Sequence, residues 1–198
     1  MDVLDRTSRF LAHRDSRRAD LRDLLAKILA TPRALTLEIG SGHGHFLTAY
    51  AIAHPERFCV GIDIMRDRVD RALRKRDRAR LQNLEFIQAD ATEFLEVLPP
   101  GIHLRDIFIL FPDPWPKRRH HKNRIVQQAF LDALAEKTEK GAHLFFRTDY
   151  APYFAEAQRE ISRHTKWSLE ETTPWPFELQ TVFQSRAAKY ESLGARVR

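Results

Sequence analysis

The sequence has a single cysteine and no long apolar run, and both absences limit what the chain can be. Cys59 has no second cysteine with which to form an internal disulfide, and its apolar neighbours Phe58 and Val60 favour a buried structural thiol over a nucleophile. No apolar stretch approaches the roughly 20 residues of a membrane-spanning helix, and no signal peptide opens the chain. We therefore expect a cytoplasmic protein that makes no use of a membrane.

Internal repeats, low-complexity segments and linkers are also missing, so the 198 residues are expected to form one domain. A hydrophobic content of 43% is enough for one buried core. Residues 1–33 are interpreted as a basic arm followed by an amphipathic helix, and residues 34–198 as the main domain. The arginines of the arm either contact nucleic acid or belong to a frayed terminus, and the sequence leaves both open.

Acidic residues are absent from residues 117–124, which hold five cations: Lys117, Arg118, Arg119, Lys122 and Arg124. These positive charges repel one another unless an anion binds among them. A formal net charge of +6 and a pI near 9.7 point the same way, with nucleic acid as the first expected partner. An acidic membrane surface is the second, which the missing apolar run and signal peptide disfavour. The alternative is a solvated basic turn before a helix, which is the usual meaning of a basic run.

The segment just before the basic run favours a functional interpretation. Ile107–Phe111 is apolar at five successive positions, which predicts a strand buried on both faces. Three prolines follow at alternate positions, so the strand is expected to stop at Pro112. Asp113 and Trp115 are then held on a stiff backbone at a strand end, where binding and catalytic residues often lie.

A second candidate ligand site begins at Glu38. The strand expected at Ala34–Ile39 leads into three alternating glycines, Gly40, Gly42 and Gly44, and then into a helix. Glycines allow a tight turn and a close ligand, while the helix supplies unpaired N–H groups. The next expected strand ends in Asp63, at about the 20-odd-residue distance at which nucleotide-binding folds place an acid on ribose hydroxyls.

Strands and helices alternate along the rest of the chain, which predicts an α/β fold with a mostly parallel sheet covered on both faces. In such a fold the ligand lies outside the carboxyl ends of the strands, where five acids are expected to converge: Glu38, Asp63, Asp90, Asp113 and Asp149. The helix expected at Arg66–Leu81 carries eight Lys/Arg, and is either a solvated face with internal ion pairs or an RNA surface. Beyond Thr181–Phe183 we expect only a short polar tail.

Several of these motifs resemble those of a known family. Glu38–Gly44 resembles the E-x-G-x-G-x-G turn of class I S-adenosylmethionine-dependent methyltransferases. Phe111–His120, which reads FPDPWPKRRH, resembles the signature of the bacterial tRNA (guanine-N7)-methyltransferases, and Arg147–Tyr150 and Thr181–Arg186 resemble two further family motifs. The resemblance implies a Rossmann-like methyltransferase fold of about seven strands over residues 34–198. The final strand that it implies is hard to see in Lys189–Arg198, and its position stays open.

The resemblance also implies an activity, the transfer of a methyl group from S-adenosylmethionine to N7 of a guanosine in tRNA, in the variable loop. It implies a cofactor site formed by Glu38, Gly40, Gly42, Gly44, Asp63, Asp90 and Asp113. Asp113 corresponds to the proposed catalytic acid, and the substrate-binding positions are Lys117, Arg118, Arg119, Asp149, Thr181, Phe183 and Gln184. No metal is expected, because no ligand stands at metal-binding distance from the His120–His121 pair.

One departure from the family pattern concerns the substrate side. Gln184 stands where the family usually has glutamate, so a contact to guanine donors loses its charge unless a neighbour such as Glu178 compensates. This leaves two alternatives, a tRNA-binding module without catalysis and a methyltransferase that acts on another RNA. Whether the protein is a monomer or a homodimer stays open.

Overall fold

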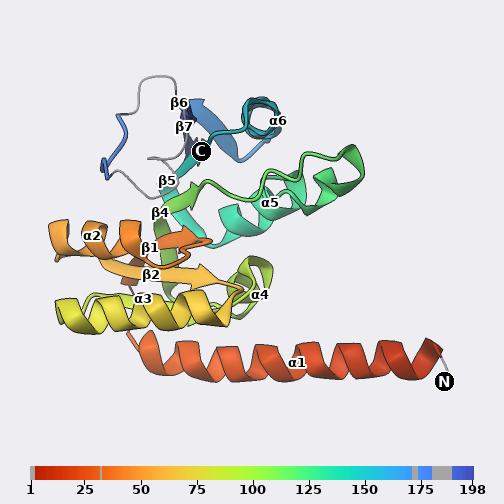
Figure 1. Cartoon of the computed structure of the whole chain (residues 1–198), viewed down its shortest axis with the longest axis vertical. Coiled ribbons are helices and arrows are strands. Elements are labelled where there is room, and N and C mark those ends of the chain that lie inside the picture. Colours follow the sequence, from red (N-terminus) through yellow and green to blue (C-terminus); the bar gives the residue numbers. More distant parts are fainter. Residues whose placement is uncertain (1–2, 32, 171–173, 180–188) are drawn as a thin grey trace.

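The structure, a computed structural model, describes residues 3–31, 33–170, 174–179 and 189–198, with the side chains of residues 3–11 and 13 left aside. Its centre is one seven-stranded sheet in the order β3-β2-β1-β4-β5-β7-β6 (Figure 1). The strands are β1 Arg33–Ile39, β2 Phe58–Asp63, β3 Leu84–Gln88, β4 Ile102–Leu110, β5 Thr138–Thr148, β6 Trp167–Glu170 and β7 Glu191–Val197.

Helices cover both faces of this sheet. They are α1 Val3–Ile28, α2 His45–Ala53, α3 Arg66–Ala79, α4 Ala91–Val97, α5 Gln128–Glu136 and α6 Ala151–Ser162, with a 3-10 helix η1 at Arg118–Asn123. Alternate residues of β4 divide the core, because Phe108 packs with α2 and α3 while Ile107 and Ile109 pack with α1, α4, α5 and α6. The α/β Rossmann-like fold expected from the sequence is confirmed.

The strands that carry the predicted acids are parallel. β1 pairs with β2 and β4, β2 with β3, and β4 with β5, all in parallel register. Their carboxyl ends therefore meet at one edge of the sheet, as the alternation of strands and helices predicts.

The expectation of a polar tail after residue 183 was wrong, because Glu191–Val197 forms β7. This strand lies antiparallel between β5 and β6, with Gly194 opposite Phe145 and Leu193 opposite Phe146. Its sequence has too few large apolar residues to signal a strand by itself. The strand is stabilised by backbone hydrogen bonds to a neighbour on each side, which only the assembled sheet supplies.

One boundary also differs from the expected one. The strand expected at Ile107–Phe111 is β4, which begins at Ile102 and ends at Leu110, because Phe111 has a φ of 49°, outside the range of strand residues. β5 continues through Gly141, whose φ of 81° accompanies a bulge in the pairing of β5 with β4. The basic run forms η1, and α5 begins after it at Gln128.

The first helix is longer than its apolar spacing indicated. Its backbone is helical from Val3, and in Figure 1 its amino-terminal end extends beyond the rest of the molecule. Leu21, Leu25 and Leu29 pack into the core, and Arg17 forms a 2.7 Å ion pair with Glu93 of α4. The carboxyl-terminal half of α1 is thus attached to the domain.

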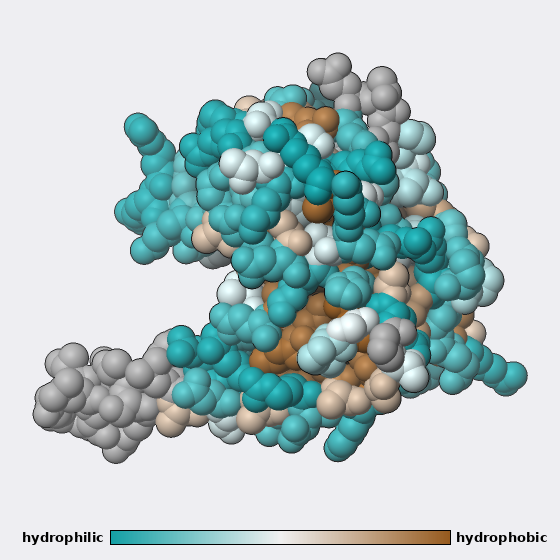
Figure 2. Space-filling view, turned by 180° about the vertical axis from the view of Figure 1, so that it is seen from behind, coloured by the Kyte–Doolittle hydropathy of each residue, from teal (hydrophilic) through white to brown (hydrophobic). Residues whose placement is uncertain are grey.

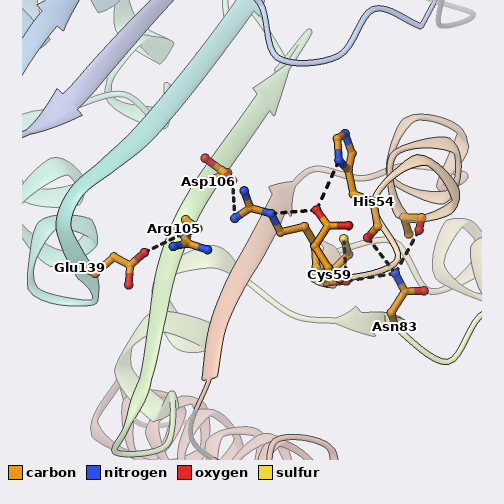
Figure 3. Close-up of polar contacts among 9 residues, drawn as sticks. His54, Cys59, Asn83, Arg105, Asp106 and Glu139 are labelled. Carbon is orange, nitrogen blue, oxygen red and sulfur yellow. Dashed lines mark hydrogen bonds and ion pairs between the residues drawn. The ribbon is translucent and has the colours of Figure 1, made fainter.

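The amino-terminal ends of the strands are joined by polar contacts far from the predicted acids (Figure 3). The side-chain amide of Asn83 donates to the carbonyl oxygens of Ala51, His54 and Arg57 at 3.0, 3.2 and 3.0 Å. Arg57 lies 3.6 Å from Asp106 of β4. Cys59 is fully buried, as expected. This end of the sheet thus carries structural contacts and none of the five predicted acids.

Candidate functional site

A cavity of about 370 Å³ opens at the carboxyl ends of β1 to β4. Three of the five predicted acids, Asp63, Asp90 and Asp113, line it together with Gly40 and Trp115. Glu38 is buried in β1 and is not among the lining residues, and Asp149 follows β5 as an exposed residue outside the lining. The predicted convergence of acids thus holds for three residues that are spread over fifty positions of the chain.

The three glycines of the turn after β1 have different surroundings. Each has a positive φ, of 75° at Gly40, 54° at Gly42 and 68° at Gly44. A Cβ added to Gly40 or Gly42 meets nothing within 4 Å, whereas one added to Gly44 would lie 2.5 Å from a ring carbon of Phe86. Gly40 and Gly42 therefore face open space, and Gly44 is required for packing between α2, α3 and β3.

Asp63 joins the glycine turn to the end of β2. Its carboxylate is 4% exposed and accepts the backbone N–H of Gly42 at 2.9 Å and that of Met65 at 2.8 Å. Arg68 of α3 lies 3.7 Å away. The Asp63 side chain thus holds the glycine turn against the end of β2. Because Asp63 also lines the cavity, its carboxylate can accept hydrogen bonds from a bound ligand.

Glu38 lies beneath the turn and is 3% exposed. Burial raises the pKa of Glu38 well above its usual range, the Leu47 backbone N–H lowers it in part, and the nearby Asp63 raises it further. Its Oε2 is buried and has no hydrogen-bond partner among the described residues. A buried carboxylate oxygen without a partner is costly, so it is a candidate to accept a donor from a ligand.

Asp90 begins the helix that follows β3. Its Oδ1 accepts the backbone N–H groups of Thr92 at 2.8 Å and Glu93 at 3.1 Å, which makes it the N-cap of α4. The same residue lines the cavity. A capping role and a ligand contact are compatible here, because the cap uses one of the two carboxylate oxygens.

The loop after β4 displays Asp113 at the cavity. Phe111 and Trp115 have φ values of 49° and 44°, so the proline-rich segment turns twice through the left-handed region. Asp113 is exposed and lines the cavity, and the ring of Trp115 meets that of His120 edge-on at 5.8 Å. The proline pattern predicts this rigid display of Asp113.

Arg124 corrects the interpretation of the basic run. Its side chain is buried, so it is not one of the phosphate-binding cations that the sequence suggested. Its guanidinium donates to the carbonyl oxygens of Pro114 at 2.9 Å and Trp115 at 3.5 Å and forms an ion pair with Glu156 of α6. Sequence reasoning missed this role, for which the only signal is that Arg124 directly precedes the apolar pair Ile125–Val126. The exposed cations of the run are Lys117, Arg118, Arg119 and Lys122.

Arg147, the first residue of the Arg147–Tyr150 motif, is buried. Its guanidinium carbon lies 3.9 Å from the ring centre of Trp175 and 4.7 Å from that of Tyr190, and its nitrogens lie 2.9 and 3.2 Å from the Glu178 carboxylate. Glu178 therefore already faces a cation, which weakens its candidacy as a substitute for the family glutamate at position 184. Thr181, Phe183 and Gln184 themselves lie outside the described residues.

A larger hollow of about 820 Å³ lies elsewhere, between α1, α3 and the edge strand β3. Its lining includes Leu21, Leu24, Ile28 and Leu73, and Figure 2 shows apolar residues gathered in a hollow beside α1. The hollow shares only Ile64, Ala89 and Asp90 with the cavity at the strand ends. It has none of the glycine-turn or proline-loop residues, so the smaller cavity is the better candidate site.

In the described part of the chain, no group of three or more histidine, cysteine or acidic residues is arranged to hold a metal ion. None of the helices described is long and apolar enough to cross a membrane.

The chain is similar to known proteins in sequence and in fold. Residues 32–197 match a protein family described as "Putative methyltransferase". The chain is 37% identical over 162 residues to the tRNA (guanine-N(7)-)-methyltransferase of Treponema pallidum (strain Nichols), with 79% of this chain and 65% of that protein covered. It is 32% identical over 178 residues to the protein of that name from Chromohalobacter salexigens, with 86% and 72% covered.

The chain thus spans just under two thirds of the Treponema relative. Among solved structures, the aminoglycoside resistance methyltransferase NpmB1 has a similar fold, with a TM-score of 0.61 and 17% identity over 89% of this chain and 93% of that one.

Proposed function

The chain belongs to the tRNA (guanine-N7)-methyltransferase family, and on that premise we propose that it transfers the methyl group of S-adenosylmethionine to N7 of a guanosine in tRNA. The observation that carries the proposal is the cavity at the strand ends, which brings Asp63, Asp90 and Asp113 together beside an open glycine turn. The variable loop as the target and the cytoplasm as the location are parts of the same proposal, supported by the family resemblance.

The residues at the cavity fit S-adenosylmethionine. Gly40 and Gly42 leave open space where any side chain would stand, which suits close approach of a ligand to the backbone. The unpartnered Oε2 of Glu38 is suited to accept the ammonium group of the methionine end. Asp63 and Asp90, at the ends of the next two strands, are suited to the ribose hydroxyls and the adenine edge. When bound, this cofactor supplies a methyl group on a positively charged sulfur.

Asp113 is proposed to act by electrostatics. Guanine N7 carries a free lone pair, so it attacks a methyl group without first losing a proton, and no general base is needed. Positive charge moves onto the purine during the transfer, and a carboxylate placed next to the base stabilises that charge. Asp113 also has the acceptors needed to hold the N1–H and N2–H₂ edge of guanine, which would fix N7 in position.

The exposed cations Lys117, Arg118 and Arg119 are proposed to hold phosphates of the tRNA next to the reacting base. They begin η1 directly after the proline loop, so RNA bound to them lies beside Asp113. Trp115 lines the cavity and offers an aromatic face for a guanine lifted from its stack. Asp149, Thr181, Phe183 and Gln184 complete the proposed substrate side.

The test is incubation of the purified chain with unmodified tRNA and methyl-labelled S-adenosylmethionine, followed by nucleoside analysis and mapping of the labelled position. Label in 7-methylguanosine in the variable loop would support the whole proposal, including the tolerance of Gln184. Label in another nucleoside or only in ribosomal RNA would overturn the substrate, and binding of both tRNA and cofactor without transfer would favour a binding module.

A further inference from the structure

Helix α3 has two flanks with different charge. Four cations recur along it at intervals of three and four residues, so they share one flank: Arg68, Arg71, Lys75 and Arg78. We call this row the α3 stripe. On the opposite flank charges of both signs alternate, with a 3.0 Å ion pair between Arg66 and Asp70. One flank of α3 is therefore purely basic, while the other carries both charges and an internal ion pair.

The α3 stripe is little compensated by acids. Within the described part of the chain, neither Arg71 nor Arg78 has a carboxylate at ion-pair distance, and Arg68 has only the 3.7 Å contact to Asp63. Lys75 donates to the carbonyl oxygen of His43 at 2.9 Å, which leaves its charge without a carboxylate. A row of like charges on an exposed flank repels itself, so it is stabilised by an anionic partner.

The stripe has Asp63 beside Arg68 at one end and histidines along its length. It runs beside the exposed His43 and His45, which flank Gly44. Partial burial lowers the pKa of His43, and the charges of Arg71, Arg68 and Lys75 lower it further, while Asp63 raises it. These effects show that the cations gather around the amino-terminal end of α2, next to the glycine turn.

The stripe begins at the cavity and leads away from it. Arg68 lines the cavity on the side of β2, whereas Trp115 and Asn123 line it on the side of β4. β1 lies between these strands in the sheet. The stripe and the exposed cations of the basic loop at Lys117–Arg119 therefore stand on opposite sides of the cavity mouth.

We propose that the α3 stripe is a second phosphate-binding surface for the RNA substrate, so that the strand crosses the cavity mouth with phosphates held on both sides of the reacting base. The inference rests on the proposed function, because it takes the substrate to be an RNA. Neighbouring cations of the stripe are spaced like successive turns of one helix face, at about 5–6 Å between Cβ atoms, which suits a polyanion better than a single anion. Such contacts position the RNA and carry no base identity.

The experiment compares two double variants that remove the same charge. Arg71→Gln with Arg78→Gln removes two of the four cations of the stripe, while Arg66→Gln with Arg105→Gln removes two cations that lie off it, one on the other flank of α3 and one at the far end of the sheet. The affinity of each protein for unmodified tRNA is measured from about 50 to 200 mM salt, the range over which phosphate contacts weaken markedly. Binding of S-adenosylhomocysteine serves as the control for an intact cavity.

We expect the stripe variant to bind tRNA at least about tenfold more weakly in low salt, with the slope of log affinity against log salt reduced by about 1.4 to 1.8, since each of the two lost phosphate contacts contributes roughly 0.7 to 0.9. The off-stripe variant should keep the parent slope. Arg71→Lys with Arg78→Lys should restore it, because phosphate binding needs the charge and not the guanidinium shape. S-adenosylhomocysteine binding should not change in any variant.

Equal slopes for the parent and the stripe variant, with the parent binding tRNA normally, would overturn this inference and leave the proposed function standing. A parent that binds no tRNA would overturn both. If the stripe variant instead lost binding to vesicles containing phosphatidylserine while its tRNA slope stayed unchanged, the stripe would belong to a membrane surface and the inference would be wrong.

Discussion

Arg124 donates its Nε–H to the carbonyl oxygen of Pro114 at 2.9 Å, from a buried position beneath the loop that displays Asp113. The same guanidinium forms an ion pair with Glu156 and lies 4.8 Å from the ring centre of Tyr153, both on α6. One buried cation thus connects the proline loop to a helix that starts more than twenty residues later. The position of Asp113 depends on this connection as well as on the prolines.

Removing Arg124 should destabilise the protein strongly. Arg124→Ala leaves the half-buried Glu156 carboxylate without its cation, and such a loss typically costs about 3–5 kcal/mol of unfolding free energy. Adding Glu156→Gln should recover part of the loss, because it removes the uncompensated charge. Urea denaturation of the single and double variants measures both effects. Arg119→Ala, at an exposed position of the same run, is the control and should stay within about 0.5 kcal/mol of the parent.

Replacing Asp113 should separate catalysis from RNA binding. We expect Asp113→Asn to lower kcat about 10²–10³-fold, the usual effect of losing one preorganised electrostatic group, while tRNA affinity changes only a few-fold. Single-turnover methyl transfer and tRNA binding are the two measurements. Asp23→Asn, an exposed acid on α1, controls for the change in net charge. Parent-like transfer by Asp113→Asn would remove Asp113 from the proposed mechanism.

Alanine at Gly44 and at Gly40 should have different consequences. Both substitutions strain a positive φ, but only Gly44→Ala also drives a Cβ to 2.5 Å from Phe86 and 2.8 Å from Ala72. Overpacking of this kind costs about 1–3 kcal/mol, so Gly44→Ala should be less stable than Gly40→Ala by that amount. Thermal denaturation tests the difference. Gly40→Ala should instead weaken S-adenosylhomocysteine binding, because its Cβ enters the open space of the turn.

The buried carboxyl of Glu38 should make stability depend on pH. Burial raises the pKa of Glu38 in the folded state, so the group favours folding most below its unfolded pKa of about 4.3 and loses that contribution as the pH rises through the folded value. Glu38→Gln should therefore be more stable than the parent at about pH 7, and the two should converge at about pH 4. Urea denaturation across this range measures the effect. A variant that is less stable near neutral pH would show that the carboxylate is compensated in the folded protein.

The same variant should bind the cofactor more weakly, because the amide cannot offer a charge to an ammonium group. Calorimetric titration with S-adenosylhomocysteine would measure this loss. A gain in stability together with a loss of binding would identify Glu38 as a residue kept for function at the expense of stability.

Part of the fold could be predicted from local sequence patterns. The apolar run at Ile107–Phe111 predicted a buried strand, and the prolines after it predicted a rigid loop with Asp113 displayed, because both depend on residues close together in the chain. β7 could not be recognised in the same way. Its residues have weak strand propensity of their own, and its place depends on two neighbours, β5 and β6, that begin more than twenty residues earlier.

The sequence by itself determined the alternation of strands and helices and the set of acids at strand ends, because apolar periodicity, prolines and glycines act through the local backbone. Its motifs indicated the family by resemblance. Only the tertiary structure decided which residues of a motif are exposed to a ligand or to solvent and which are buried in the core. Gly40 and Gly44 belong to the same glycine turn, yet Gly40 faces open space and Gly44 is packed against Phe86. Arg119 and Arg124 belong to the same basic run, yet Arg119 is exposed and Arg124 is buried. Burial depends on what distant segments bring near a residue, in these cases Phe86 of β3 and Glu156 of α6, and no local pattern contains that information.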